Sequence, residues 1–136
     1  MPDPEGTLTA AQYEILAVAW DAGDAGVGVA DVWRAVAARR PVARTTVLNL
    51  VDRLEKRGWL RRRPDGNSYR YTAAVARDWA ESRLAAGFLG EYFGGSATQM
   101  VQSLLGAKEL TGDDIDRLRK LLDDAKRARG GKGGRP

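Results

Sequence analysis

The chain has 136 residues, carries a formal net charge of +4 at pH 7, and contains neither cysteine nor histidine. Disulfides, zinc sites of the Cys/His type, cysteine nucleophiles and histidine general bases are therefore excluded. The first ten residues lack a basic region followed by an apolar core, so we expect no signal peptide. No apolar run approaches the roughly 20 residues of a membrane span. These features predict a cytoplasmic protein that is not an enzyme and uses no cofactor.

The basic residues are concentrated in one part of the chain. Residues 34–70, called the basic block below, hold 11 bases and three acids, a net charge of +8. Residues 1–33 have a net charge of −6, residues 71–125 have −3, and residues 126–136 have +5. A basic block of this kind is expected of a segment that meets phosphate groups. A solvated basic face without a partner would leave the same pattern.

Two helices are predicted before the basic block. Thr9 and Gln12 have the spacing of a capping box, which predicts the start of the first helix. Residues 21–28 are rich in glycine and aspartate and predict a loop. A second, shorter helix is expected over residues 29–39, because its valines and tryptophan recur with helical spacing.

The basic block has the pattern of one helix followed by a tight hairpin. Apolar residues recur with a helical period over residues 44–57, and Gly58 has the position of a left-handed residue that ends a helix. Two strands are predicted over residues 59–63 and 68–71, joined by a Pro-Asp-Gly-Asn turn at residues 64–67. This is the outline of a winged helix-turn-helix, in which the helix enters the major groove of DNA and the hairpin, or wing, lies along the backbone.

Side chains within the hairpin are expected to alternate between two faces. Arg61 and Arg63 share one face, and Arg62 lies on the other. Tyr69 and Tyr71 also share a face. We expect both tyrosines to cover the inner side of the hairpin. For the arginines we expect more than contact with solvent, because a long wing would be unnecessary just to close a small core.

The outer side chains of this helix and hairpin are of types that contact DNA. Asparagine bonds adenine, arginine bonds guanine, and Leu48 suits a thymine methyl group, while threonines at a helix N-terminus suit phosphate. Asp52 would accept from cytosine or pair with Lys56 at i+4, and we favour the pair. Arg39 and Arg40 would touch phosphate or favour the dipole of the second helix. The predicted DNA-binding residues are Arg44, Thr45, Thr46, Leu48, Asn49, Arg53, Lys56, Arg61, Arg63, Asn67 and Arg70.

After residue 73 the sequence predicts helices with apolar stripes. They are expected over residues 75–93, where Gly94-Gly95 end the helix, over residues 97–105, and from Thr111, which would cap the last helix. A winged-helix domain alone does not need these apolar faces, so we expect them to pack against a second copy of the chain. The predicted dimerisation residues are Trp79, Leu84, Phe88, Leu89, Tyr92, Phe93, Met100, Leu104, Ile115, Leu118, Leu121 and Leu122.

Several segments, in their order and spacing, resemble the penicillinase-repressor (BlaI/MecI-type) family of winged-helix regulators. They are LTAAQYEILAVAWDAG, TTVLNLVDRLEKRGWLRR, NSYRY, FLGEYFGG and KELTGDDIDRLRKLLDD, and the resemblance extends over nearly all of residues 8–124. It implies a homodimeric repressor whose winged helix binds double-stranded operator DNA and whose C-terminal helices dimerise. The resemblance also implies, position by position, which residues face DNA: Thr45, Thr46, Asn49 and Arg53 on the helix, and Arg63 and Arg70 on the wing.

Three features depart from the pattern of this family. Leu48 stands where relatives often carry a basic residue, so the operator sequence is not transferred. The resemblance implies a sensor-linked protease as a further partner, but Ser103-Leu104 stands where the best-known relatives carry the Asn-Phe bond that it cuts. Copper-responsive relatives use C-terminal cysteines, which this chain lacks.

We therefore expect a mainly α fold with a small β-hairpin. Its parts would be a winged helix-turn-helix DNA-binding domain at residues 1–73, a helical dimerisation region at 74–129 and a disordered basic tail at 130–136. The expected function is that of a homodimeric repressor with no membrane partner. Two alternatives stay open: a winged-helix protein–protein adaptor that does not bind DNA, and a regulator with a small-molecule pocket lined by Trp79, Phe88 and Tyr92.

Overall fold

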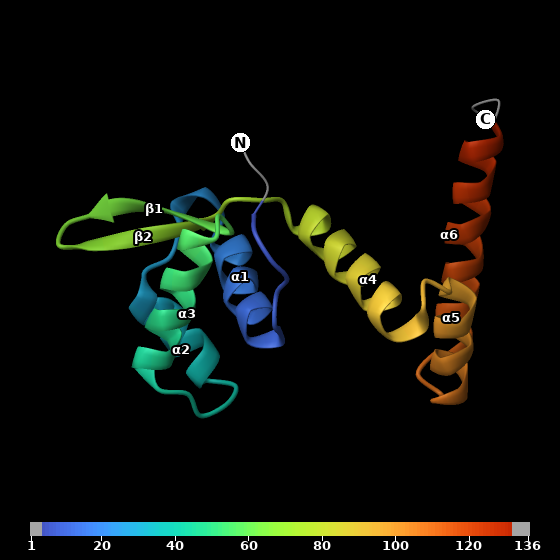
Figure 1. Cartoon of the computed structure of the whole chain (residues 1–136), viewed down its shortest axis with the longest axis horizontal. Coiled ribbons are helices and arrows are strands. Elements are labelled where there is room, and N and C mark those ends of the chain that lie inside the picture. The colour runs from blue at the N-terminus through green and yellow to red at the C-terminus, as the bar shows by residue number, and fades with distance from the viewer. Residues whose placement is uncertain (1–3, 132–136) are drawn as a thin grey trace. The chain divides into compact units, whose positions relative to one another are not determined.

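The computed structural model describes residues 4–131. Within this range the fold is mainly helical with one two-stranded antiparallel hairpin, which confirms the expected fold class (Figure 1). The elements are, in order, α1 (Ala10–Ala22), the 3-10 helix η1 (Gly23–Ala25), α2 (Val29–Ala37), α3 (Arg44–Lys56), β1 (Leu60–Asp65), β2 (Ser68–Ala73), α4 (Arg77–Phe93), α5 (Ala97–Gly106) and α6 (Gly112–Gly131).

The chain divides into two compact units between Gly87 and Phe88. The first unit thus contains α1–α3, the hairpin and the first part of α4, whereas the sequence placed the end of the DNA-binding domain at residue 73. Trp79 and Ala80 explain the difference. The Trp79 ring lies 6.1 Å from the ring of Trp59, and Ala80 is fully buried in the same core.

Local chemistry sets the ends of the first helices. The Thr9 side chain accepts from the Gln12 N–H, and the Thr9 N–H donates to the Gln12 side chain, which confirms the capping box. The turn between α2 and α3 is held by Trp33, whose indole N–H donates to the Val42 carbonyl at 3.0 Å. Gly58, at φ 86°, follows α3 in the left-handed conformation that was expected there.

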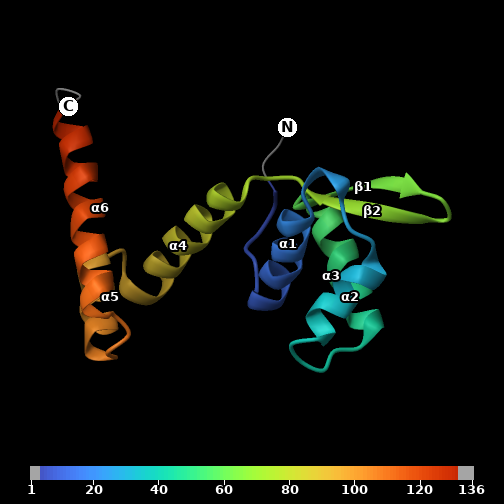
Figure 2. The same ribbon diagram turned by 180° about the vertical axis from the view of Figure 1, so that it is seen from behind.

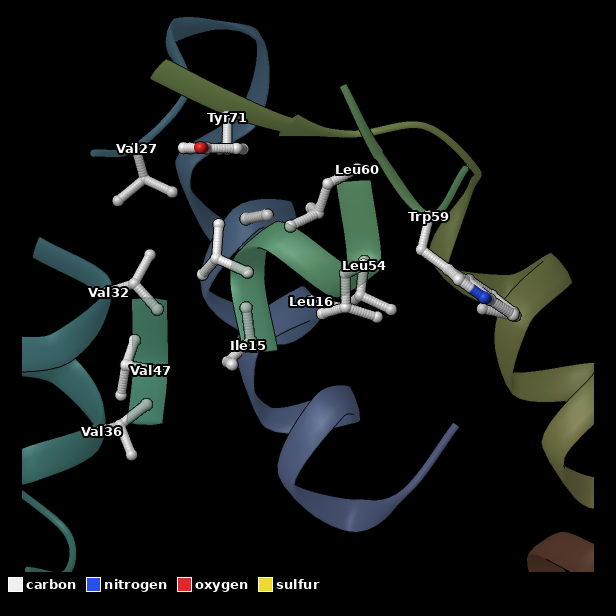
Figure 3. Close-up of a cluster of buried hydrophobic side chains, with 13 residues drawn as sticks. Ile15, Leu16, Val27, Val32, Val36, Val47, Leu54, Trp59, Leu60 and Tyr71 are labelled. Atoms are coloured by element: carbon white, nitrogen blue, oxygen red, sulfur yellow. The ribbon is translucent and has the colours of Figure 1, made fainter. Parts of the chain in front are cut away.

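One hydrophobic core joins α1, α2, α3 and the base of the hairpin. Figure 3 shows its side chains converging between these elements. Each fully buried aliphatic side chain stabilises the fold by about 1.5–3 kcal/mol. From α3 the core takes Val47, Val51 and Leu54, while Leu50 is half-buried. Burial of this stripe fixes which face of α3 points outward.

The hairpin is longer than predicted. Its register runs from Leu60 opposite Ala73 to Asp65 opposite Ser68, so only Gly66 and Asn67 form the connection. Pro64 was expected in the turn but pairs with Tyr69 in the ladder. A proline is tolerated there because each strand of a two-stranded sheet is an edge strand.

The two tyrosines of the hairpin have different environments. Tyr71 is buried in the core, as expected, but Tyr69 is 41% exposed, so the prediction for Tyr69 was wrong. The reason is that the hairpin continues past the helices (Figure 2). Tyr69 pairs with Pro64, one pair before the turn, and so lies near the tip. There the guanidinium of Arg62 stacks over its ring at 4.2 Å.

The second unit buries little of its apolar surface. In residues 88–130 no side chain is buried. Ser96 caps α5 and Thr111 caps α6, and each side chain accepts a hydrogen bond from the N–H three residues later. These caps stabilise the N-termini of both helices. The large hydrophobic side chains exposed in this unit are Phe88, Tyr92, Val101, Leu105, Leu118, Leu121 and Leu122.

α6 is longer than predicted at its C-terminal end. It continues through Gly130 and Gly131, which the sequence assigned to the tail. The rest of the predicted tail, residues 132–136, lies outside the described residues. No helix in the described chain is both long and apolar enough to span a membrane.

Candidate nucleic-acid interface

The outer face of α3 presents a row of exposed side chains opposite its buried stripe. Thr45, Thr46, Asn49 and Arg53 are all exposed, as the sequence predicted for the DNA side. Leu48 lies among them and is 47% exposed. A leucine this open is outside the core, so its apolar surface is available to a ligand.

The polar groups of this face are not used inside the unit. Across residues 4–131, no side-chain hydrogen bond or ion pair engages Thr45, Thr46, Asn49 or Arg53. Several other surface arginines of the first unit do pair with acids or backbone carbonyls, among them Arg34, Arg40 and Arg57. The outer face of α3 therefore keeps its donors and acceptors free for base edges.

Asp52 and Lys56 form the ion pair that was favoured from their i, i+4 spacing. The Lys56 Nζ lies 3.0 Å from the Asp52 carboxylate. The pair is exposed, so it contributes little stability. The pair matters for electrostatics, since Asp52 offsets one positive charge at the edge of the outer face of α3.

The N-terminus of α3 has the features of a phosphate site. Ala43, the N-cap, offers no side chain to the helix, and the first N–H groups of a helix have no intrahelical acceptor. The positive end of the helix dipole lies at the same place. Arg44 is held nearby, with its guanidinium 5.8 Å from the centre of the Trp33 ring.

Arg39 and Arg40 have a partner that the sequence did not predict. Both reach back to Glu14 of α1, at 3.6 Å and 2.8 Å. The Glu14 side chain is only 13% exposed. These two arginines therefore tie the helix-turn-helix to α1.

The wing arginines divide into two groups. Arg63 and Arg70 donate to backbone carbonyls of the η1 loop, which precedes α2. Arg61 is exposed and has no side-chain partner in the described part of the chain. Arg62 was not among the predicted site residues, yet it is exposed and stacks on Tyr69. Strand alternation, which puts Arg62 on the tyrosine face, was the signal that could have found it.

The described residues contain no group of three or more acidic, histidine or cysteine side chains that could hold a metal ion. The site consists of one helix face, its N-terminus and a basic hairpin. Its chemistry is hydrogen bonding, apolar contact and positive charge. This combination matches duplex DNA rather than a small ligand.

Comparison with known families agrees with this geometry. Residues 8–124 match the family model described as Penicillinase repressor. The chain belongs to the penicillinase-repressor family. Members of this family are transcriptional repressors with a DNA-binding winged helix, so the protein is a transcriptional regulator and not an enzyme.

Curated relatives span almost the whole chain. The penicillinase repressor of Staphylococcus aureus is 23% identical over 124 residues, which cover 91% of this chain and 97% of that protein. The methicillin resistance regulatory protein MecI of Mammaliicoccus sciuri is 21% identical over 116 residues, which cover 85% of this chain and 93% of that protein.

Solved structures show the same fold at low identity. A mutant of MepR from S. aureus superposes with a TM-score of 0.52 and 16% identity, covering 89% of this chain and 80% of that chain. A mutant MarR from E. coli gives a TM-score of 0.50 and 22% identity, covering 87% and 77%. At these identities the likeness establishes the winged-helix fold alone.

Proposed function

We propose that this penicillinase-repressor family member is a homodimeric repressor that reads a two-fold operator, with α3 in the major groove and the wing on the backbone. The observation that carries the proposal is the unoccupied outer face of α3. Asn49 and Arg53 are exposed at its centre without internal partners. Side chains of these types read adenine and guanine in the major groove.

The other contacts follow from position. Thr45, Thr46 and Arg44 surround the N-terminus of α3 and suit phosphate oxygens. Lys56 and Arg61 extend the positive surface toward the wing, and Asn67 occupies the wing tip. Leu48 provides an apolar contact, and the thymine methyl is the apolar group that the major groove offers.

Dimerisation is supported by the apolar surface of the second unit. Tyr92, Leu121 and Leu122 are each 65% exposed in the single chain. Helices with such open apolar faces need a partner to bury them, and a second copy is the partner that a two-fold operator requires. Phe88, with ring contacts to Tyr92 and Phe93, would contribute an aromatic cluster to the same interface.

The proposal is tested with duplex DNA from the region upstream of the protein's own gene. Asn49→Ala and Arg53→Ala should each weaken specific binding by about five- to 150-fold, since one base contact is worth about 1–3 kcal/mol. Gln102→Ala and Arg119→Ala, which remove the same groups from exposed positions of the second unit, should bind like the parent. If both α3 variants bind like these controls, the outer face of α3 is not the surface that contacts DNA.

A further inference from the structure

The wing is attached to the loop between α1 and α2 by two arginines that face each other across the hairpin. Arg63 donates to the Asp24 carbonyl at 3.2 Å and to the Ala25 carbonyl at 2.6 Å. Arg70 donates to the Ala25 carbonyl at 3.0 Å and to the Gly26 carbonyl at 3.4 Å. The Ala25 carbonyl therefore accepts from both. We call these four contacts the loop–wing clamp.

The loop offers these carbonyls because it ends a 3-10 helix. The Gly26 N–H turns back to the Gly23 carbonyl at 3.1 Å, and η1 stops at Ala25. The last carbonyls of a helix have no N–H partner within it. A guanidinium carries its N–H groups in a flat, rigid fork and can reach adjacent carbonyls at once, whereas a lysine offers a single nitrogen.

The backbone beside the clamp already brings the loop and the wing together. Val27 and Tyr71 exchange both N–H···O bonds, at 2.9 Å and 2.8 Å, as a one-residue extension of the sheet. The next pair toward the wing tip is Arg63 opposite Arg70. The clamp thus continues the attachment outward from the core toward the wing tip.

We infer that Arg63 and Arg70 are positioning residues for DNA binding, which fix the wing to the α1–α2 loop, and that Arg61 is a wing cation that contacts phosphate. This inference rests on the proposed function. The carbonyl bonds engage both terminal nitrogens of Arg63 and fix where its guanidinium lies, so we assign its main effect on DNA binding to the position of the wing. Arg61, by contrast, is exposed with no partner among the residues described.

Lysine substitutions separate the two roles, because lysine keeps the charge and loses the fork. Duplex affinity of the full-length protein is measured across a salt series. Arg63→Lys is expected to bind about three- to tenfold more weakly than the parent with the same salt slope. Arg61→Lys should stay within about twofold of the parent, while Arg61→Gln should reduce the salt slope by about 1. Parent-like affinity for Arg63→Lys, combined with a slope reduced by about 1 for Arg63→Gln, would overturn the assignment.

A second measurement needs no DNA. The amides of Gly26 and Val27 are bonded inside the loop and to the wing, so their hydrogen exchange reports on the clamp. In the free protein, Arg63→Lys should speed exchange at both amides by about tenfold. Arg61→Lys should leave both rates unchanged. Equal rates in the two variants would refute the clamp.

The two measurements also keep this inference apart from the proposed function. A parent protein that binds no duplex DNA would refute the operator-binding role, and exchange at Gly26 would still show whether the clamp exists. Normal DNA binding by the parent, with no exchange or affinity effect in Arg63→Lys, would refute the positioning role alone.

Discussion

Substitution of Gly26 tests how closely the α1–α2 loop approaches the wing. Gly26 has φ 77° and ψ 178°, a region that other residues enter at a cost of about 1–3 kcal/mol. A Cβ there would lie 3.1 Å from the Tyr71 carbonyl oxygen and 3.3 Å from Cγ2 of Thr72. Such crowding in a packed site adds about 1–3 kcal/mol. We therefore expect Gly26→Ala to lower the free energy of unfolding by about 2–6 kcal/mol.

Gly23 provides a matched control in the same loop. Its φ of 64° and ψ of −150° are close to those of Gly26, but a Cβ there would meet nothing within 4 Å. Gly23→Ala should therefore cost only the backbone strain of about 1–3 kcal/mol. All four tryptophans lie in the first unit, so urea unfolding followed by tryptophan fluorescence reports on this unit. Equal losses in the two variants would show that the loop does not press on the wing.

Three further predictions concern single contacts. Asp52→Asn should strengthen DNA binding by about two- to fivefold in a gel-shift assay, because Lys56 loses its acidic partner. Deoxyuridine lacks the methyl group of thymine. Replacing the thymine that we propose Leu48 contacts by deoxyuridine should weaken binding of the parent but not of Leu48→Ala, because that variant has already lost the methyl contact. A hydrogen bond from Tyr13, and next one from Arg77, lowers the pKa of Glu81 below its ordinary 4.5. The charged carboxylate therefore stabilises the folded state above pH 4.5, and this stabilisation is lost as the pH falls through the pKa of the folded state. The stability difference between parent and Tyr13→Phe, measured by urea unfolding, should therefore shrink below pH 4.5 and stay constant near neutrality; a difference that grows on acidification would contradict this.

Features set by neighbouring residues could be predicted from the sequence. The capping box of Thr9 and Gln12, the end of α3 before Gly58, and the Asp52–Lys56 pair all depend on groups within four positions of each other. Such contacts follow from the spacing of residue types alone. The order of helices and hairpin followed from hydrophobic period and turn chemistry in the same way.

Features set by distant residues could not be predicted. Tyr69 has the same strand parity as Tyr71, but only the length of the hairpin beyond the core decides that it is exposed. Arg63 and Arg70 have the composition of phosphate contacts, yet their guanidinium groups meet carbonyls that lie about 40 positions earlier. Local patterns carry no information about such partners.

The composition of the basic block predicts a polyanionic partner more reliably than it predicts which side chains touch that partner. Arg39 and Arg40 count toward its net charge, but Glu14, which lies outside the block, neutralises part of their field. Arg63 bonds neutral carbonyls, so it keeps its full charge and still attracts a polyanion, whereas Arg70 also pairs with Asp65 at 3.4 Å, which offsets part of its field. The attraction of DNA toward the site thus depends on the sum of all nearby charges, including the negative charge of Glu14. Specific contact depends on the smaller set of side chains on α3 and the wing that nothing in the fold already engages.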